Sequence, residues 1–186
     1  HRRTRGYRWG YGKLRRKGTL FLREHQEHMP YKQGIFIDIF PLDGVPDNYL
    51  ARAVKNFQCF CVRKILWSEV GRVAEKSYWK RQWFALLSRI PEKMIWRYYG
   101  RMIACANKKN TKMVRILMFP TPNREFGYWR KWYADSQSIT FEGKTFQGIR
   151  DYEGYLSFKF GNYMELPPAS MRKVHPVSGL RVLNEI

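Results

Sequence analysis

The chain has 186 residues, of which 44% are hydrophobic and 17% aromatic. This composition excludes a disordered chain, and the length suits one domain that spans residues 1–186. Thirty-five Lys and Arg residues against 15 Asp and Glu residues give a formal net charge of +20. We therefore expect an affinity for polyanions, which include nucleic acids, anionic lipid headgroups, phosphate polymers and nucleotides.

The cysteines and the hydropathy of the chain bear on its cellular compartment. Cys59, Cys61 and Cys105 are odd in number, which favours a reducing compartment over a disulfide framework. Their spacing is not that of a zinc site, so we expect structural thiols. No apolar run approaches the roughly 20 residues that a membrane-spanning helix needs. A cytoplasmic protein is the expectation.

Basic and aromatic side chains alternate in residues 1–17, where Tyr7, Trp9 and Tyr11 stand among lysines and arginines. Such a segment can bind a single-stranded nucleic acid, with the rings stacked on bases and the cations along the phosphates. The alternative is a solvated basic arm whose rings pack on the domain. The sequence alone leaves both interpretations open.

Residues 19–23 predict a short strand, which we expect to pair with residues 35–40. The loop between these two strands contains His25 and His28. Two histidines are too few ligands to define a metal site, so a surface loop is the preferred interpretation.

The most informative segment is residues 34–47, Gly-Ile-Phe-Ile-Asp-Ile-Phe-Pro-Leu-Asp-Gly-Val-Pro-Asp. Residues 35–40 predict a strand, since β-branched and aromatic residues dominate them. Alternation along the strand places Asp38 on the same face as Phe36 and Phe40. A buried carboxylate needs a partner, which is either one of the many arginines, a nearby loop, or a metal ion at a cleft. Residues 41–44 then turn the chain.

Three helices are expected after this segment. The first runs from about residue 48 to 70, with Asp47 as its N-cap and Gly71 as its end. The second follows Ser77, and the third runs from Pro91 to about residue 108. Spacings of three and four residues predict the core-facing side chains: Leu50, Val54, Phe57, Cys61 and Ile65 in the first helix, Trp79, Trp83, Leu86 and Ile90 in the second, and Ile95, Tyr98, Met102 and Cys105 in the third.

A row of basic residues follows the same spacing: Arg89, Lys93, Arg97 and Arg101. With Trp96 and Tyr99 beside it, this row suits either a solvated helix face or peripheral contact with an anionic membrane. Pro91 interrupts the row, which weakens the membrane interpretation.

Strands and a fourth helix complete the expected α+β fold, a small mixed sheet with several packed helices. Residues 113–119 predict a strand, and residues 139–147 predict a hairpin that turns at Gly143-Lys144. Asp151 is expected to cap a helix that Gly161 ends.

The segment 34–46 resembles the signature of the LicD family, the phosphocholine-transferase and fukutin-related group of the nucleotidyltransferase-fold superfamily. Residues 11–19 resemble the stretch that precedes this signature, and residues 141–168 with His175 resemble the family's C-terminal signature. Asn162 and Gly148 depart from the family pattern, where Asp and Pro are typical. These departures put the detailed fit of the substrate in question.

The resemblance implies a nucleotidyltransferase-like fold and an Mg²⁺-dependent transferase. Such an enzyme moves a phosphocholine-like group, either a phospho-alditol or a phospho-amino-alcohol, from a CDP-choline-like nucleotide donor. The implied acceptor is a hydroxyl of an anionic cell-surface glycan, teichoic acid or glycolipid. The implied site residues are Asp38 as catalytic residue and metal ligand, Lys13, Arg15 and Arg16 at the donor phosphates, and Asp43, Tyr163 and His175 at the substrate.

One part of the family pattern is missing. The family has an earlier block, a Gly-Gly turn followed by aspartates that bind the metals, whereas the acids before Asp38 are Glu24 and Glu27. We therefore expect the N-terminally incomplete, major C-terminal part of a longer protein, with an inactive LicD-like scaffold as an alternative. The rival from another class is a basic, aromatic nucleic-acid-binding module, which Asp38 between two rings disfavours.

Overall fold

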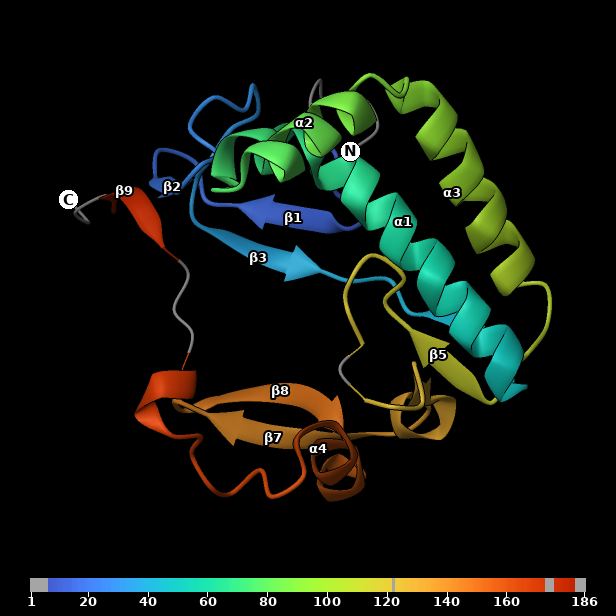
Figure 1. Ribbon diagram of the computed structural model, residues 1–186. Coiled ribbons are helices and arrows are strands. Elements are labelled where there is room, and N and C mark those ends of the chain that lie inside the picture. The colour runs from blue at the N-terminus through green and yellow to red at the C-terminus, as the bar shows by residue number, and fades with distance from the viewer. Residues whose placement is uncertain (1–6, 122, 173–175, 183–186) are drawn as a thin grey trace. The chain divides into compact units, whose positions relative to one another are not determined.

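The computed structural model (Figure 1) describes residues 7–121, 123–172 and 176–182. Helices and small sheets alternate along the chain, which confirms the α+β class. In place of a mixed sheet, the strands of the described residues form four small sheets, and every pairing in them is antiparallel. None of these residues forms a helix that is both long and apolar enough to span a bilayer.

The chain folds into two compact units. Unit 1 comprises the described residues up to Pro41, Cys59–Gly100 and the described residues from 176 onward. Unit 2 comprises Leu42–Gln58 and Arg101–Arg172. The expectation of a single domain remains a prediction.

In unit 1, β1 (Gly12–Arg15) pairs with β3 (Phe36–Ile39), and β2 (Leu20–Arg23) pairs with β9 (Val177–Arg181). The predicted pairing of residues 19–23 with residues 35–40 is therefore wrong. The basic, aromatic N-terminal segment supplies the partner strand, and its register sets Lys13 opposite Asp38. Opposite charges in register stabilise an antiparallel pair.

The core of unit 1 is aromatic. Tyr7, Met29, Tyr31 and Val70 are buried together, and Tyr7 meets Tyr31 edge to face with 5.8 Å between ring centroids. The rings of the N-terminal segment thus pack on the unit, because Tyr11 is buried as well. Since these two tyrosines cannot stack on bases, the nucleic-acid interpretation loses the contacts on which it depended.

Helix α1 (Tyr49–Ala74) begins and ends at other residues than predicted. Asn48 caps it, because its Oδ1 accepts a hydrogen bond of 3.0 Å from the backbone N–H of Ala51. Gly71 lies inside the helix instead of ending it. A Cβ atom at Gly71 would lie 2.7–2.8 Å from atoms of the Trp67 and Phe84 rings, so glycine allows these rings to approach the helix backbone.

The predicted core face of α1 is also wrong. Leu50, Val54 and Phe57 are exposed, with exposed fractions of 73%, 60% and 65%, and Cys61 and Ile65 are half-buried. Another face of the same helix is buried instead, with Cys59, Val62, Leu66 and Val70 preceded by Arg52. Apolar residues recur on both faces of α1, so periodicity alone could not decide which face packs.

Helices α2 (Tyr78–Ser88) and α3 (Glu92–Ala106) follow Ser77 and Pro91 as predicted. In α3 the predicted core residues Ile95 and Met102 are buried, whereas Tyr98 and Cys105 are exposed. In α2 the predicted stripe is wrong: Trp79, Trp83 and Leu86 are exposed, Ile90 beyond the helix is half-buried, and the buried side chain is Phe84.

Unit 2 contains a sheet of three short strands, β4 (Asp43–Val45), β5 (Met113–Arg115) and β6 (Tyr128–Trp129), with β5 in the centre. The strand predicted over residues 113–119 is therefore shorter. Asp43 and Gly44 lie in β4 and do not form the expected turn. The short 3-10 helix η1 (Arg130–Tyr133) follows β6, and its Trp132 is buried.

The hairpin of β7 (Ser136–Phe141) and β8 (Lys144–Ile149) is present, and Figure 1 shows it as two orange strands. Its turn lies one residue earlier than predicted, at Glu142-Gly143. Both residues have positive φ angles, 48° and 72°, which defines the turn type that matches strand twist. Helix α4 (Tyr152–Phe160) begins and ends as predicted: Asp151 caps it, Gly161 ends it, and the short 3-10 helix η2 (Ala169–Met171) follows.

Candidate functional site

Asp38 and Lys13 form an ion pair across β1 and β3 in unit 1. Lys13 Nζ lies 2.5 Å from Asp38 Oδ1, and the exposed fractions of the two side chains are 5% for Lys13 and 23% for Asp38. The ammonium group also lies 3.4 Å from the centroid of the Phe36 ring. Burial lowers the pKa of Lys13, and the hydrogen bond and charge of Asp38 oppose this shift. Asp38 thus has a lysine as its partner, where we expected an arginine, a loop or a metal.

Strand alternation explains the surroundings of this pair. Phe36, Asp38 and Phe40 lie on the half-buried face of the β3 segment, as predicted, while Ile37 and Ile39 are exposed. Tyr11, from the residue before β1, packs against Phe40 with 4.8 Å between ring centroids. Aromatic rings therefore cover the ion pair and strengthen it by excluding water.

Lys13 and Arg15 also line a small pocket in unit 1. The guanidinium carbon of Arg15 lies 5.5 Å from the Tyr31 ring and 5.7 Å from the Phe36 ring. The pocket has a volume of about 10 Å³, so it holds about one water molecule. A phosphate group would enter only after side chains move. The lining residues are Trp9, Lys13, Arg15, Phe21, Arg23, Gln26, Tyr31, Gln33 and Phe36.

The other residues implied at the donor and substrate are spread over both units. Arg16 is exposed, directly after β1. Tyr163 is half-buried in the loop after α4, where its backbone N–H donates to the Gly161 carbonyl. His175 lies outside the described residues. The roles implied for these three residues remain predictions.

Asp43, in unit 2, is buried with an exposed fraction of 4%. The Asn107 side chain donates a hydrogen bond of 2.8 Å to Asp43 Oδ1 and accepts one of 2.9 Å from the backbone N–H of Gly44. Within the described part of the chain, Asp43 Oδ2 has no hydrogen-bond partner. Burial raises the pKa of Asp43, and the Asn107 hydrogen bond opposes this effect. A substrate contact by Asp43 would require this buried group to become accessible.

The described residues do not assemble a magnesium site. No group of three or more His, Cys, Asp or Glu side chains within residues 7–121, 123–172 and 176–182 could hold a metal ion. Asp38 supplies one carboxylate, and Lys13 binds it. Because Mg²⁺ requires six well-placed oxygen ligands, these residues alone do not fit it. The expected Mg²⁺ requirement remains a prediction, and we assign no catalytic step to the ion.

Two buried arginines organise unit 2, and sequence reasoning missed both. Arg52 donates hydrogen bonds to the carbonyls of Pro46 and Asp47, at 3.1 and 2.7 Å, and pairs with Glu125. It thereby fixes the end of the LicD-like signature. Arg115 has no measurable exposure and donates to Asn56 Oδ1. A lone arginine in a highly basic chain gives no signal of such a role.

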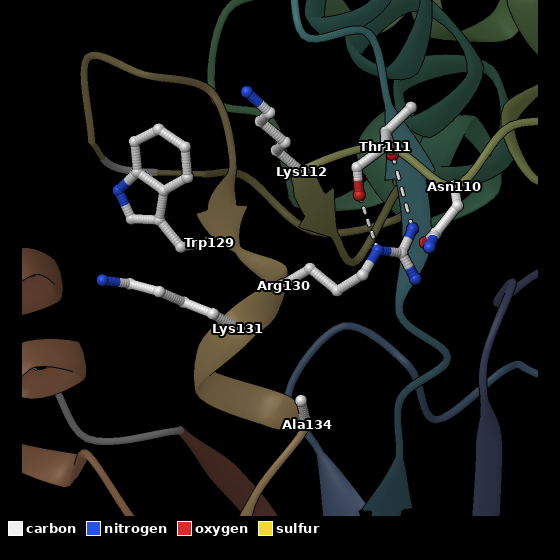
Figure 2. Close-up of a pocket in the computed structure, with 7 residues that line it drawn as sticks. All are labelled: Asn110, Thr111, Lys112, Trp129, Arg130, Lys131 and Ala134. Atoms are coloured by element: carbon white, nitrogen blue, oxygen red, sulfur yellow. Dashed lines mark hydrogen bonds between the residues drawn. The ribbon is translucent and has the colours of Figure 1, made fainter.

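A second pocket lies in unit 2, between the segment before β5 and the segment after β6 (Figure 2). Its volume is about 530 Å³. Arg130 holds the two segments together, because its Nε donates to the Thr111 carbonyl at 2.6 Å and its backbone N–H donates to the Lys112 carbonyl at 2.8 Å. Figure 2 shows the Trp129 indole between the side chains of Lys112 and Lys131. The pocket, lined by Asn110, Thr111, Lys112, Trp129, Arg130, Lys131 and Ala134, contains no acidic residue.

These features define a class of protein: a basic α+β chain with two pockets that are lined by cationic and aromatic side chains. The chain is similar to a lipopolysaccharide cholinephosphotransferase, LicD of Haemophilus influenzae. The two are 24% identical over 168 residues, which covers 82% of this chain and 58% of that protein. The chain therefore spans less than two thirds of this relative. No family profile and no solved structure matches the chain, so the nucleotidyltransferase-like fold remains a prediction.

Proposed function

We propose that this chain is part of a transferase that moves a phosphocholine-like group from a CDP-choline-like donor to a hydroxyl of a lipopolysaccharide or related glycan. The similarity to the Haemophilus influenzae cholinephosphotransferase carries this proposal. The reaction forms a bond between the acceptor oxygen and the phosphorus that bears choline, and it breaks the bond to CMP. Such transfers depend on positioning and charge stabilisation, which suits a strongly basic protein.

Unit 1 supplies the groups that we assign to the donor. Lys13 and Arg15 are cations on β1, and Arg15 makes no ion pair with another described residue. Cations on one strand can bind the diphosphate as it approaches and stabilise the negative charge that develops on CMP. Asp38 holds the Lys13 ammonium in place. Mg²⁺ dependence is part of the proposal on the strength of the resemblance to the LicD family alone, since the described residues do not hold the ion by themselves.

Unit 2 supplies a pocket that we assign to glycan binding. A half-exposed indole can stack on a sugar ring, and Trp129 has an exposed fraction of 38%. Lys112 and Lys131 stand on either side of it without an ion pair to another described residue, so both can bind phosphate or carboxylate groups of a glycan. An anionic glycan thus matches the lining of this pocket.

The test is a transfer assay with labelled CDP-choline, lipopolysaccharide and Mg²⁺. Asp38→Asn should lower transfer at least about 100-fold, because it releases Lys13 and removes the carboxylate. Lys131→Gln should raise the KM for the acceptor and leave the KM for CDP-choline unchanged. Chelation of divalent ions should abolish transfer by the unaltered chain.

Asp135→Asn is the matched control, since Asp135 is an exposed carboxylate with a fraction of 76% and a long, 3.7 Å pair to Arg150. Its activity should equal that of the unaltered chain. Transfer by Asp38→Asn at the control's rate, with equal amounts folded, would remove Asp38 from the site. CDP-choline binding by titration separates loss of the donor site from loss of chemistry.

A further inference from the structure

Helix α2 exposes large apolar side chains that a soluble surface does not normally carry. The exposed fractions of Tyr78, Trp79, Trp83 and Leu86 are 58%, 80%, 57% and 54%. Trp79, Trp83 and Leu86 follow one another at steps of four and three residues, so they share one face of the helix. An extended patch of this kind marks a surface that binds something.

The way that α2 is anchored explains why this face points outward. Phe84 is the buried side chain of the helix, and its ring meets Trp67 of α1 edge to face with 5.1 Å between centroids. Gly71 gives Phe84 room against the α1 backbone. Trp83, which precedes Phe84, therefore lies on a different side of the helix from the contact with Trp67. Residues 76–83 are all exposed.

The charges within residues 76–91 are all positive. Residues 76–91 contain Lys76, Lys80, Arg81 and Arg89 and no Asp or Glu. Lys80 makes a long, 3.8 Å pair with Glu75, whereas Lys76, Arg81 and Arg89 make no ion pair with another described residue. Apolar and cationic side chains thus cover the same short helix, and Lys93 and Arg97 on α3 add exposed cations nearby in the sequence.

We propose that α2 is a membrane-docking surface, on which Trp79, Trp83 and Leu86 enter the interface of a bilayer rich in anionic lipids. Tryptophan and tyrosine favour the boundary between headgroups and acyl chains. Basic side chains beside them bind the anionic headgroups, and together they give the composition of a helix that lies in the membrane plane. A bilayer fits better than a nucleic acid, because leucine gains nothing in a phosphate-lined groove. Docking does not depend on the transferase activity proposed above.

The test is sedimentation of the chain with vesicles of phosphatidylcholine alone and with vesicles that also contain phosphatidylglycerol. The unaltered chain should bind the anionic vesicles, and added salt should weaken this binding. The double variant Trp79→Ser, Trp83→Ser should lower the partition coefficient at least about tenfold, because each exposed indole contributes apolar area. Lys76→Gln with Arg81→Gln should reduce the preference for anionic lipid and leave the apolar contact intact.

The double variant Phe141→Ser, Phe146→Ser is the matched control. Both rings lie on the β7–β8 hairpin with exposed fractions of 64% and 48%, and their removal should not change vesicle binding. Circular dichroism establishes that all variants are folded. Equal partitioning of the tryptophan variant and the control would overturn the proposal. Light scattering would also overturn the proposal if it showed that the unaltered chain self-associates and that the tryptophan substitutions abolish this self-association. The occupant of the surface would then be a second copy of the chain.

Discussion

Asp38 and Asp43 lie five residues apart in the LicD-like segment, yet one has a charged partner and the other a neutral one. Asp38 in unit 1 is partly exposed and paired with the Lys13 ammonium. Asp43 in unit 2 is buried, and its neighbour is the neutral side chain of Asn107. Burial raises the pKa of Asp43, and the hydrogen bond from Asn107 opposes this shift. A signature read from sequence can therefore contain two aspartates of unlike chemistry.

The difference indicates what each carboxylate can do. The charge of Asp38 is balanced by the Lys13 ammonium, so another cation could bind Asp38 only by displacing Lys13. Asp43 instead holds the β4 backbone through Asn107, which also binds the N–H of Gly44. We therefore assign a structural role to Asp43 and the reactive role to Asp38. Three experiments test this contrast.

The largest expected effect comes from breaking the ion pair. Asp38→Ala leaves the Lys13 ammonium, which is 5% exposed, without its partner, and should lower the free energy of unfolding by about 3 kcal/mol. Lys13→Met in the same chain should recover most of this loss, because the uncompensated charge is gone. Urea denaturation of the two single variants and the double variant measures the coupling. Additive losses would show that the pair contributes little.

A smaller effect is expected at Asn107. Asn107→Leu removes the hydrogen bonds to Asp43 Oδ1 and from the Gly44 N–H, and should lower the free energy of unfolding by about 2 kcal/mol. Thermal or urea unfolding measures it. Asn110→Leu, in the open pocket of unit 2, serves as the control and should change stability little. If both variants lose the same free energy of unfolding, the hydrogen bonds of Asn107 do not contribute specifically to stability.

The smallest effect is a pH dependence that belongs to Asp43. Its pKa in the folded state lies above the unfolded value of 3.8, so the unfolded chain releases the proton first as the pH rises. The contribution of Asp43 to stability is therefore present below pH 3.8 and is lost as the pH rises through the raised pKa. Asp43→Asn should lack this loss, so its stability should change less than that of the unaltered chain as the pH rises above 3.8. Unfolding curves at several pH values measure this. Free energies of unfolding that change with pH in the same way for Asp43→Asn and the unaltered chain would contradict it.

Local signals in the sequence predicted the elements well. Ser77, Pro91 and Asp151 marked helix starts that the structure confirms, because caps and prolines act over a few residues. Strand alternation in residues 35–40 also depends only on neighbouring residues, and it correctly placed Asp38 on the same face as Phe36 and Phe40. The burial of Tyr7 and Tyr11 was one of two open interpretations, and only packing could decide between them.

Features that depend on distant residues could not be predicted. Trp79 and Trp83 have the spacing of a core stripe, but Phe84 packs on Trp67 instead, and that contact depends on a glycine in another helix. The partner of Asp38 depends on which strand pairs with β3. Arg52 contacts carbonyls and a carboxylate of Glu125, far along the chain, which no local pattern reveals.

The pairing of β2 with β9 has a consequence for biosynthesis. Leu20 pairs with Arg181, so this ladder closes only after more than 150 further residues have been synthesised. The backbone groups of β2 that pair with β9 must wait for this partner during translation, whereas the β7–β8 hairpin can form soon after its own residues are synthesised. If translation stopped shortly before residue 177, β2 would lack its partner β9. Its unpaired edge would then make unit 1 prone to aggregation.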